Sequence, residues 1–183
     1  DDNNEQTDDS GEKKGLTDEE KQEIKEKTGW SDEIIDSIGS MEEAQIYMKA
    51  GLKEKIINGK TALVQPRIEG KAHNAPQWPD WSNKDLAEEG YAPRDNNGIP
   101  YELHHIGQYP DSPLAELTWE EHHANGNFKK LHTFDESKID RCDFEREKQN
   151  YCKLCNFRRL KVKRAYNQPT FNIHSRNHRR KYQ

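Results

Sequence analysis

Hydrophobic residues are sparse at the start of the chain and, between positions 16 and 51, recur at the spacing of short amphipathic helices. Thr17 and Glu20 form a capping-box pattern, which predicts a polar helix that runs to about Lys27 and ends at Gly29. Residues 1–15 carry almost no apolar side chain, so we expect them to be a disordered linker.

Two more short helices are predicted in the N-terminal region. Ser31 is expected to cap the first, and Ser40 with Glu43 to cap the second, which ends at Gly51. The apolar side chains of this region are expected in the core: Trp30, Ile34, Ile35 and Ile38.

The pattern then changes to two strand-like runs, 53–57 and 60–64, which are separated by Asn58 and Gly59. This dipeptide tolerates the positive φ angles of a two-residue hairpin turn. A β-hairpin is therefore predicted here.

Residues 65–81 contain three prolines together with Trp78 and Trp81, which favours an irregular connection anchored by aromatic burial. Asn83 is expected to cap a short helix over residues 84–89. We see no internal repeat along the chain.

Two further short apolar runs, 101–103 and 113–117, predict two strands. Thr118 with Glu121 three residues later is a second capping-box pattern, so a helix is expected from about residue 119. The order in this part of the chain is thus strand, strand, helix.

Five of the eight histidines fall within residues 101–132. They are His104, His105, His122, His123 and His132. Imidazole binds late transition metals, and its ordinary pKa of about 6.5 lets it accept a proton near neutral pH. This stretch is therefore the candidate for metal binding and proton transfer.

The adjacent pair His104 and His105 follows a strand, in which successive side chains point to opposite faces. One of the two can then hold a metal while the other faces the substrate. Phosphodiester hydrolysis needs a deprotonated water, a cation for the charge on the leaving group, and a group that fixes the base. The region is therefore interpreted as a one-metal nuclease site.

The ordered motifs ELHH, Gly107-Gln108, SPLAELT, EEH, GN and LH resemble the LHH branch of the HNH endonucleases. Members of that branch are toxin domains at the C-termini of bacterial polymorphic toxins, and the ELHH element alone is similar to that of colicin-type nucleases. The resemblance covers about residues 30–152 and is clearest over residues 101–132. It implies an α+β fold: a ββα-metal (His-Me finger) nuclease core preceded by N-terminal helices and a β-hairpin.

The resemblance implies that His104, His122 and His132 bind one divalent metal ion, which could be zinc, nickel, magnesium or manganese. Imidazole ligands suit zinc or nickel, whereas magnesium prefers carboxylates and water. Many sites of this kind place two helix histidines four residues apart, but Gly126 stands four residues after His122. His132 must then reach the site by a bend in the chain.

The resemblance also implies that His105 is the general base. Glu102 is similar to the acidic residue that orients the site through a basic partner, and Asn127 or Gln108 would align His105. His123 is given no role, because one of two adjacent helical residues usually faces away.

The three cysteines, Cys142, Cys152 and Cys155, do not suggest a secreted disulfide framework. A Cys-x-x-Cys followed by a His-x-x-x-His is the outline of a small zinc module: Cys152, Cys155, His174 and His178. The interval between the pairs is long and contains Pro169, which favours a disordered or loosely docked basic tail instead.

The formal net charge of −5 hides an asymmetry between an acidic N-terminal region, 1–43, and residues 156–183, which carry nine cations and no acid. Such a tail attracts phosphates without sequence preference. The cations assigned to nucleic-acid binding are Arg158, Arg159, Lys161, Lys163 and Arg164. An acidic partner is the alternative ligand.

At 183 residues, with 30% hydrophobic and 34% charged residues, the chain suits one domain with solvated ends. We expect a linker at 1–15, a nuclease domain at 16–151 with its catalytic motif at about 100–133, and a basic tail at 152–183. No apolar run is long enough for a transmembrane helix, and no signal peptide is apparent.

The leading hypothesis is a metal-dependent endonuclease toxin with DNA as the first-choice substrate and RNA as the second. The resemblance implies a parent toxin chain N-terminal to this domain, delivery into the cytoplasm of a target cell, and a cognate immunity protein. The main alternative is a non-catalytic, zinc-stabilised nucleic-acid-binding module, and a purely structural domain is the third.

Overall fold

The computed structural model describes residues 15–66, 68, 79–133 and 139–161, with the side chains of the last helix described as far as Lys153. The helices are α1 (Asp18–Thr28), α2 (Asp32–Ser37), α3 (Met41–Lys49), α4 (Asn83–Glu88), α5 (Trp119–His123), α6 (Asn127–Leu131) and α7 (Arg141–Lys161). The strands are β1 (Lys53–Ile57), β2 (Lys60–Val64), β3 (Glu102–His105) and β4 (Leu114–Leu117), and two 3-10 turns are η1 (Ile106–Gln108) and η2 (Ala124–Gly126). This is the predicted α+β fold.

The strands form one sheet in the order β1-β2-β4-β3. β1 and β2 are the predicted antiparallel hairpin, and the φ angles of 55° at Asn58 and 76° at Gly59 are those of the expected two-residue turn. β4 lies parallel to β2 and antiparallel to β3. The sheet therefore joins the hairpin to the two strands of the histidine region.

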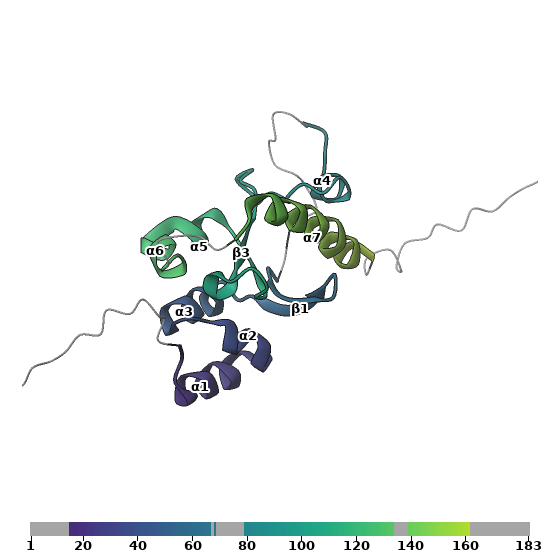
Figure 1. Ribbon diagram of the computed structural model, residues 1–183. Coiled ribbons are helices and arrows are strands. Elements are labelled where there is room, and N and C mark those ends of the chain that lie inside the picture. The colour runs from purple at the N-terminus through teal and green to yellow at the C-terminus, as the bar shows by residue number, and fades with distance from the viewer. Residues whose placement is uncertain (1–14, 67, 69–78, 134–138, 162–183) are drawn as a thin grey trace, which may run out of the picture.

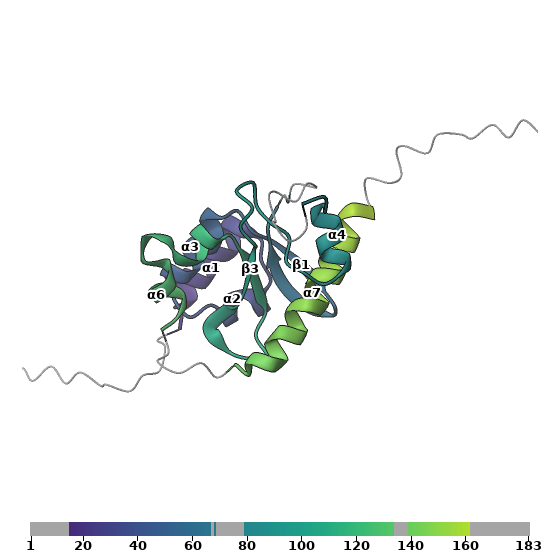
Figure 2. The same cartoon turned by 90° about the horizontal axis from the view of Figure 1, so that it is seen from above.

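Helices cover both faces of this sheet, as Figures 1 and 2 show, with α1, α2 and α3 on one side and α4 and α7 on the other. Side chains alternate between the faces, so Leu63 and Ala115 join the core with the N-terminal helices. Val64 and Leu114 join the second core, which includes Tyr151 of α7. Each face of the sheet thus has its own hydrophobic core.

The N-terminal helices follow the predicted capping signals in part. Thr17 and Glu20 form the complete capping box at α1. At α3 the Ser40 hydroxyl accepts a hydrogen bond from the Glu43 backbone N–H, but the Glu43 carboxylate bonds elsewhere, including the backbone N–H of Gly39. Trp30 and the three isoleucines are buried, as expected.

The predicted cap of α4 was wrong by one residue. Ser82 is the N-cap, because Asp85 at the third helical position completes a capping box with it. The Asn83 side chain instead makes two hydrogen bonds of 2.8 Å to the backbone of Arg94. It therefore fixes the loop that leads toward β3.

The last described helix, α7, follows the histidine region and consists largely of charged residues. The Asp140 carboxylate accepts a hydrogen bond of 2.9 Å from the backbone N–H of Asp143, which satisfies a donor of the first turn. Phe144 packs inward against the second core. The helix also continues across residue 152, where the basic tail was expected to begin.

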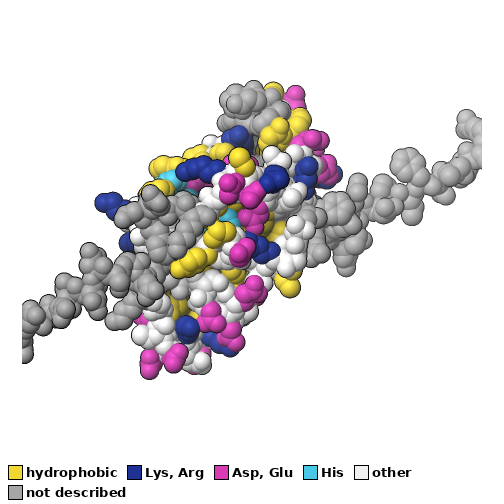
Figure 3. All heavy atoms as spheres, viewed as in Figure 1, with side chains coloured by type: hydrophobic (Ala, Val, Ile, Leu, Met, Phe, Trp, Pro, Cys, Tyr) yellow, Lys and Arg dark blue, Asp and Glu magenta, His cyan; other side chains and the backbone are white. Residues whose placement is uncertain are grey.

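Several predictions lie outside the described residues: the linker up to residue 14, the burial of Trp78, and the chain beyond residue 161. Among the described helices, none combines the length and apolar character needed to span a bilayer. On the face shown in Figure 3, acidic and basic side chains are interspersed, and histidine side chains reach the surface between them.

Candidate metal and nuclease site

The histidine region folds as β3, β4 and α5 in sequence order, and two left-handed residues then turn the chain back. Asn125 (φ 56°) and Gly126 (φ 74°) separate α5 from α6, so the chain bends between the two short helices. His132 caps the end of α6 and returns to the site. The bend expected from the missing histidine at position 126 is thus present.

His104, His122 and His132 come together as predicted. One ring nitrogen from each lies within 4.8 Å of the others. The ring centroids are 5.3 Å apart for His104 and His122, 4.9 Å for His104 and His132, and 5.0 Å for His122 and His132. This near-equilateral arrangement is what three ligands around one ion require.

Hydrogen bonds determine which nitrogen of two of these rings can bind an ion. Nδ1 of His122 contacts the Glu102 carboxylate, and Nδ1 of His132 lies 2.9 Å from the carbonyl oxygen of Phe128. Both partners accept hydrogen bonds, so Nδ1 carries the proton in each ring and Nε2 keeps its lone pair.

The Nε2 atom of His122 indicates that the three-histidine group can hold a metal ion. It is buried and makes no hydrogen bond within the described residues. A buried polar atom without a partner is costly, and an ion held by the three imidazoles would satisfy it. The three-histidine group therefore fits a divalent metal and leaves a position for water or substrate.

The charge state of the group also suits metal binding. Burial lowers the pKa of His122, and this outweighs the opposing effect of the Glu102 carboxylate, so the pKa lies below its ordinary value. Burial acts to raise the pKa of Glu102, but hydrogen bonds and charge from His122 and His123 outweigh it and leave the pKa lowered. Near neutral pH the imidazole is then neutral and the carboxylate ionised.

His123, for which the sequence suggested no role, also contacts Glu102. Its Nε2 lies 2.8 Å from the Glu102 carboxylate, and its ring stacks on Trp119 at 5.0 Å and on Phe128 at 5.3 Å between centroids. Glu102, His122 and His123 thus form a second close group that shares one residue with the first. The predicted basic partner of Glu102 is therefore this pair of histidines.

His105 lies on the opposite face of β3. It pairs with Leu114, whose side chain belongs to the second core, whereas His104 pairs with Ala115 of the first. The divergence expected from strand geometry is confirmed. The His105 side chain is only 1% exposed and packs on Phe144 of α7, with 4.6 Å between ring centroids.

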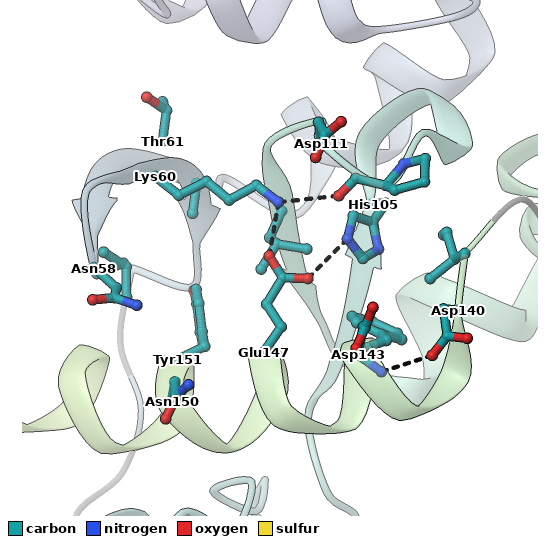
Figure 4. A pocket seen from close by; sticks show the side chains of 16 residues that line it. Asn58, Lys60, Thr61, His105, Asp111, Asp140, Asp143, Glu147, Asn150 and Tyr151 are labelled. Atoms are coloured by element: carbon teal, nitrogen blue, oxygen red, sulfur yellow. Dashed lines mark hydrogen bonds and ion pairs between the residues drawn. The ribbon is translucent and has the colours of Figure 1, made fainter.

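Figure 4 shows what His105 contacts on this face. Its Nε2 lies 2.9 Å from one carboxylate oxygen of Glu147, and the other oxygen is 2.7 Å from the Lys60 ammonium of β2. Burial lowers the pKa of His105, and despite the raising effect of Glu147 the net shift is downward. These residues line a cavity of about 500 Å³ between the hairpin and α7.

The two residues expected to align His105 make other hydrogen bonds. The Gln108 side-chain oxygen accepts from the backbone N–H of Thr133 at 2.7 Å, and Asn127 donates to the carbonyl oxygen of Glu121 at 2.9 Å. The His105 ring instead has the Glu147 carboxylate and the backbone of Pro110 as hydrogen-bond partners. Asn127 and Gln108 instead hold the two ends of the segment between α5 and Thr133.

The turn after β3 is fixed by Gly107 and by Glu43 of α3. Gly107 has a φ of 69°, and a Cβ atom there would lie 2.3 Å from the backbone oxygen of Ser37. Its N–H donates to the buried Glu43 carboxylate at 2.9 Å, which also accepts from the Tyr47 hydroxyl at 2.8 Å. The N-terminal helices therefore hold the end of the strand that carries both histidines.

Glu147 and Lys60 were not identified from the sequence. Glu147 lies in a charged helix 42 residues after His105, and Lys60 lies at a strand end 87 residues before Glu147. Neither has a neighbouring motif that would single it out. Only the tertiary packing of α7 on the hairpin brings them to His105.

The second metal site proposed from the sequence stays a prediction. Cys152 is buried in the second core beside Tyr151, and α7 continues past Cys155. The side chain of Cys155, and the positions of His174 and His178, lie outside the described residues. Of the cations assigned to nucleic-acid binding, Arg158, Arg159 and Lys161 lie on α7 with side chains outside the described part, and Lys163 and Arg164 lie beyond it altogether.

Comparison with known protein families identifies the region just described. Residues 82–156 match the LHH family, a nuclease of the HNH/ENDO VII superfamily with conserved LHH. The β3, β4 and α5 elements of this segment are consistent with the ββα-metal fold of HNH nucleases. No curated protein and no solved structure matches the chain.

Proposed function

We propose that the chain is a metal-dependent endonuclease that hydrolyses phosphodiester bonds, with DNA as the first-choice substrate and RNA as the second. One observation carries the proposal. One ring nitrogen from each of three histidines lies within 4.8 Å of the others beside one face of β3, and His105, the residue after the first of them, is buried on the other face. The family match supports a nuclease, and thus a nucleic-acid substrate.

The residues divide the chemistry between them. A divalent ion held by His104, His122 and His132 would supply positive charge for the phosphate in the transition state. Glu102 orients the His122 ring by accepting a hydrogen bond from its Nδ1–H, and the Phe128 carbonyl oxygen does the same for His132. His105, neutral near pH 7, is proposed to accept the proton of the attacking water.

Zinc or nickel is the favoured ion on the ligand chemistry. Three imidazole nitrogens suit late transition metals, whereas magnesium and manganese are usually held by carboxylates, carbonyl oxygens and water. Metal preference in a cleavage assay therefore reports on whether the histidine group is the working site.

A cavity beside the metal group offers one cation for a phosphate. It has a volume of about 620 Å³, borders Glu102, His122 and His123, and is also lined by Arg141 of α7. Arg141 can hold a phosphate that flanks the cleaved bond, whereas Lys148 of the same lining is paired with Glu145.

In the cell, we propose that this nuclease is the toxic domain of a larger chain that precedes it, delivered into the cytoplasm of a competing cell. The series of motifs that begins with ELHH and ends with LH resembles that of polymorphic-toxin domains, which supports this role. A cognate immunity protein that neutralises it would be acidic where it meets the basic substrate-binding surface.

The test is to incubate the full chain with supercoiled plasmid, and separately with RNA, together with zinc, nickel, magnesium or manganese. We expect nicking and linearisation of the plasmid that EDTA abolishes and added metal restores. Binding of nucleic acid without cleavage under every metal would contradict the proposal and support the non-catalytic binding module.

A further inference from the structure

Four aromatic rings form a continuous stack beside the metal group. Outward from His132, the rings of Phe128, His123 and Trp119 follow in turn, with 4.2 Å, 5.3 Å and 5.0 Å between successive centroids. Successive ring planes are inclined by only 26°, 14° and 19°, so neighbouring rings lie nearly parallel. The stack therefore extends from a proposed metal ligand to an outer indole ring.

Trp119 and Phe128 are the exposed members of this stack. Their exposed fractions are 46% and 47%, whereas large aromatic side chains are mostly buried in folded proteins. One face of the Trp119 indole lies on the His123 ring, and among the described residues no second ring stacks on it. The opposite face of the indole therefore contributes to the exposed surface.

The stack has a fixed geometry before any ligand binds. Trp119 and His123 lie four residues apart on α5, and Phe128 comes from α6, which lies beside α5 (Figure 1). The His123 ring under the indole is also held by the Glu102 carboxylate, 2.8 Å from its Nε2. A planar surface that is already ordered loses little conformational entropy on binding.

A nucleobase is the ligand that fits an exposed indole face beside a nuclease site. Bases of a single strand stack on aromatic side chains, whereas bases in a duplex are already stacked on one another. The stack leads to His132, which lies in the three-histidine group. A strand whose base lies on Trp119 would therefore pass close to the metal group.

Charged residues beside the stack favour the same ligand. Lys129 and Lys130 follow Phe128 in α6, are exposed, and form no ion pair within the part of the chain that the structure describes. They can hold phosphates of the strand whose base is stacked. Glu120, which follows Trp119, is exposed and repels phosphate, so the strand is expected to run toward α6.

We propose that Trp119 is a base-stacking residue that binds an unpaired nucleobase close to the cleaved bond, which makes single-stranded nucleic acid the preferred substrate. This inference rests on the proposed nuclease function and specifies its substrate class. Trp119 touches the base and not the reacting atoms, so its loss should weaken substrate binding without slowing the chemical step.

The first experiment measures binding without cleavage. The full chain in EDTA is titrated with a single-stranded oligothymidine of about 12 nucleotides, and with the same strand annealed to oligodeoxyadenosine. We expect the single strand to bind more tightly and to quench tryptophan fluorescence. In Trp119→Phe most of the quenching should disappear while the affinity stays within about threefold, because phenylalanine keeps a planar ring.

The decisive variant is Trp119→Leu, because leucine keeps an apolar side chain but has no planar ring. We expect the dissociation constant for the single strand, and the KM for its cleavage, to rise by about 10-fold. Duplex binding, kcat and zinc affinity should stay within about twofold of the wild type. Ile56→Ala is the control, because it removes an apolar side chain that is 60% exposed from β1, at the opposite edge of the sheet from β3.

Three results would overturn the inference. The first is an unchanged single-strand affinity in Trp119→Leu, which would leave the exposed rings to a protein partner. The second is an equal loss of affinity for single strand and duplex. The third is weaker zinc binding with unchanged affinity for DNA, which would mean that the stack only holds the metal ligands in place.

The outcomes separate the inference from the function on which it rests. If the wild type cleaves and Trp119→Leu cleaves the single strand with an unchanged KM, only the stacking role is lost. If the wild type cleaves neither DNA nor RNA with any metal, the proposed function fails, and the fluorescence titration still decides whether Trp119 binds an unpaired base.

Discussion

The two faces of β3 carry the two halves of the proposed site, and these halves are built differently. On one face, the metal group and the carboxylate that orients it come from Glu102 to His132, a single stretch of chain. On the other, His105 is surrounded by Lys60, Phe144 and Glu147, which reach it from the hairpin and from α7. The first half is local in sequence and the second is assembled by tertiary packing.

This difference implies different sensitivities. The metal half depends on a few polar side chains and on the bend between α5 and α6. The half around His105 depends on how α7 packs against the hairpin. Substitutions in the metal half should therefore lower metal affinity, and substitutions around His105 should lower the rate of cleavage alone. A substitution in the turn that holds both halves should lower both.

That shared support is the turn after β3, and Gly107→Ala should have the largest effect. The new Cβ would meet the Ser37 carbonyl oxygen at 2.3 Å and the backbone would keep a φ of 69°. We expect a loss of about 3 to 5 kcal/mol in unfolding free energy, with metal binding and cleavage lost together.

Thermal and urea unfolding measure this effect, and Gly126→Ala is the control. Gly126 has a similar φ of 74°, but nothing lies within 4 Å of its added Cβ, so only about 1 to 2 kcal/mol should be lost. Equal losses for the two variants would mean that the close approach to Ser37 does not support the strand end.

His122→Ala should abolish the metal half alone. It removes the ligand whose Nε2 is buried without a hydrogen bond, and with it the third imidazole of the group. We expect cleavage to fall by about a thousandfold or more, since metal stabilisation of the transition state is worth several kcal/mol. Calorimetric titration with zinc should show no tight site, and a retained tight site would exclude His122 as a ligand.

Glu102→Gln should weaken the metal half without removing it. The amide can no longer act as a charged acceptor for both His122 and His123. Loss of such an orienting carboxylate typically costs about 10- to 100-fold in metal affinity. The decisive contrast is with His105→Ala: excess metal should restore cleavage to the Glu102 variant but not to the His105 variant.

Arg141→Ala should have the smallest effect. Arg141 is exposed and lines the cavity beside His122 and His123, where it would contact phosphate but not the reacting atoms. We expect DNA binding to weaken by about threefold, with a shallower dependence on salt and an unchanged kcat. Filter-binding titrations over a range of salt concentrations measure this, and an unchanged slope would remove Arg141 from the substrate surface.

Sequence patterns predicted the local half of the site well. The capping box at Thr118 and the strand period predicted the order strand, strand, helix, and the family resemblance implied that His122 and His132 join His104. The hairpin was likewise found from its Asn58-Gly59 turn. The patterns act over a few residues, where spacing determines the local structure.

The contacts around His105 could not be predicted from local sequence patterns. Glu147 is one of several acidic residues in a charged helix, and nothing in the helix period indicates which one meets a histidine in another element. Glu43 was expected to complete a helix cap but is buried and holds Gly107. Such long-range polar contacts depend on how the elements pack, which local patterns do not specify.

The proposed division between metal binding and proton transfer is tested most directly by comparing His105→Ala with the wild type in plasmid cleavage and in metal binding. We expect the rate of cleavage to fall by at least about 100-fold, because a general base is lost, and the zinc dissociation constant to stay within about twofold of the wild type. Full cleavage activity in His105→Ala would contradict the central claim that the two faces of β3 divide metal binding from proton transfer.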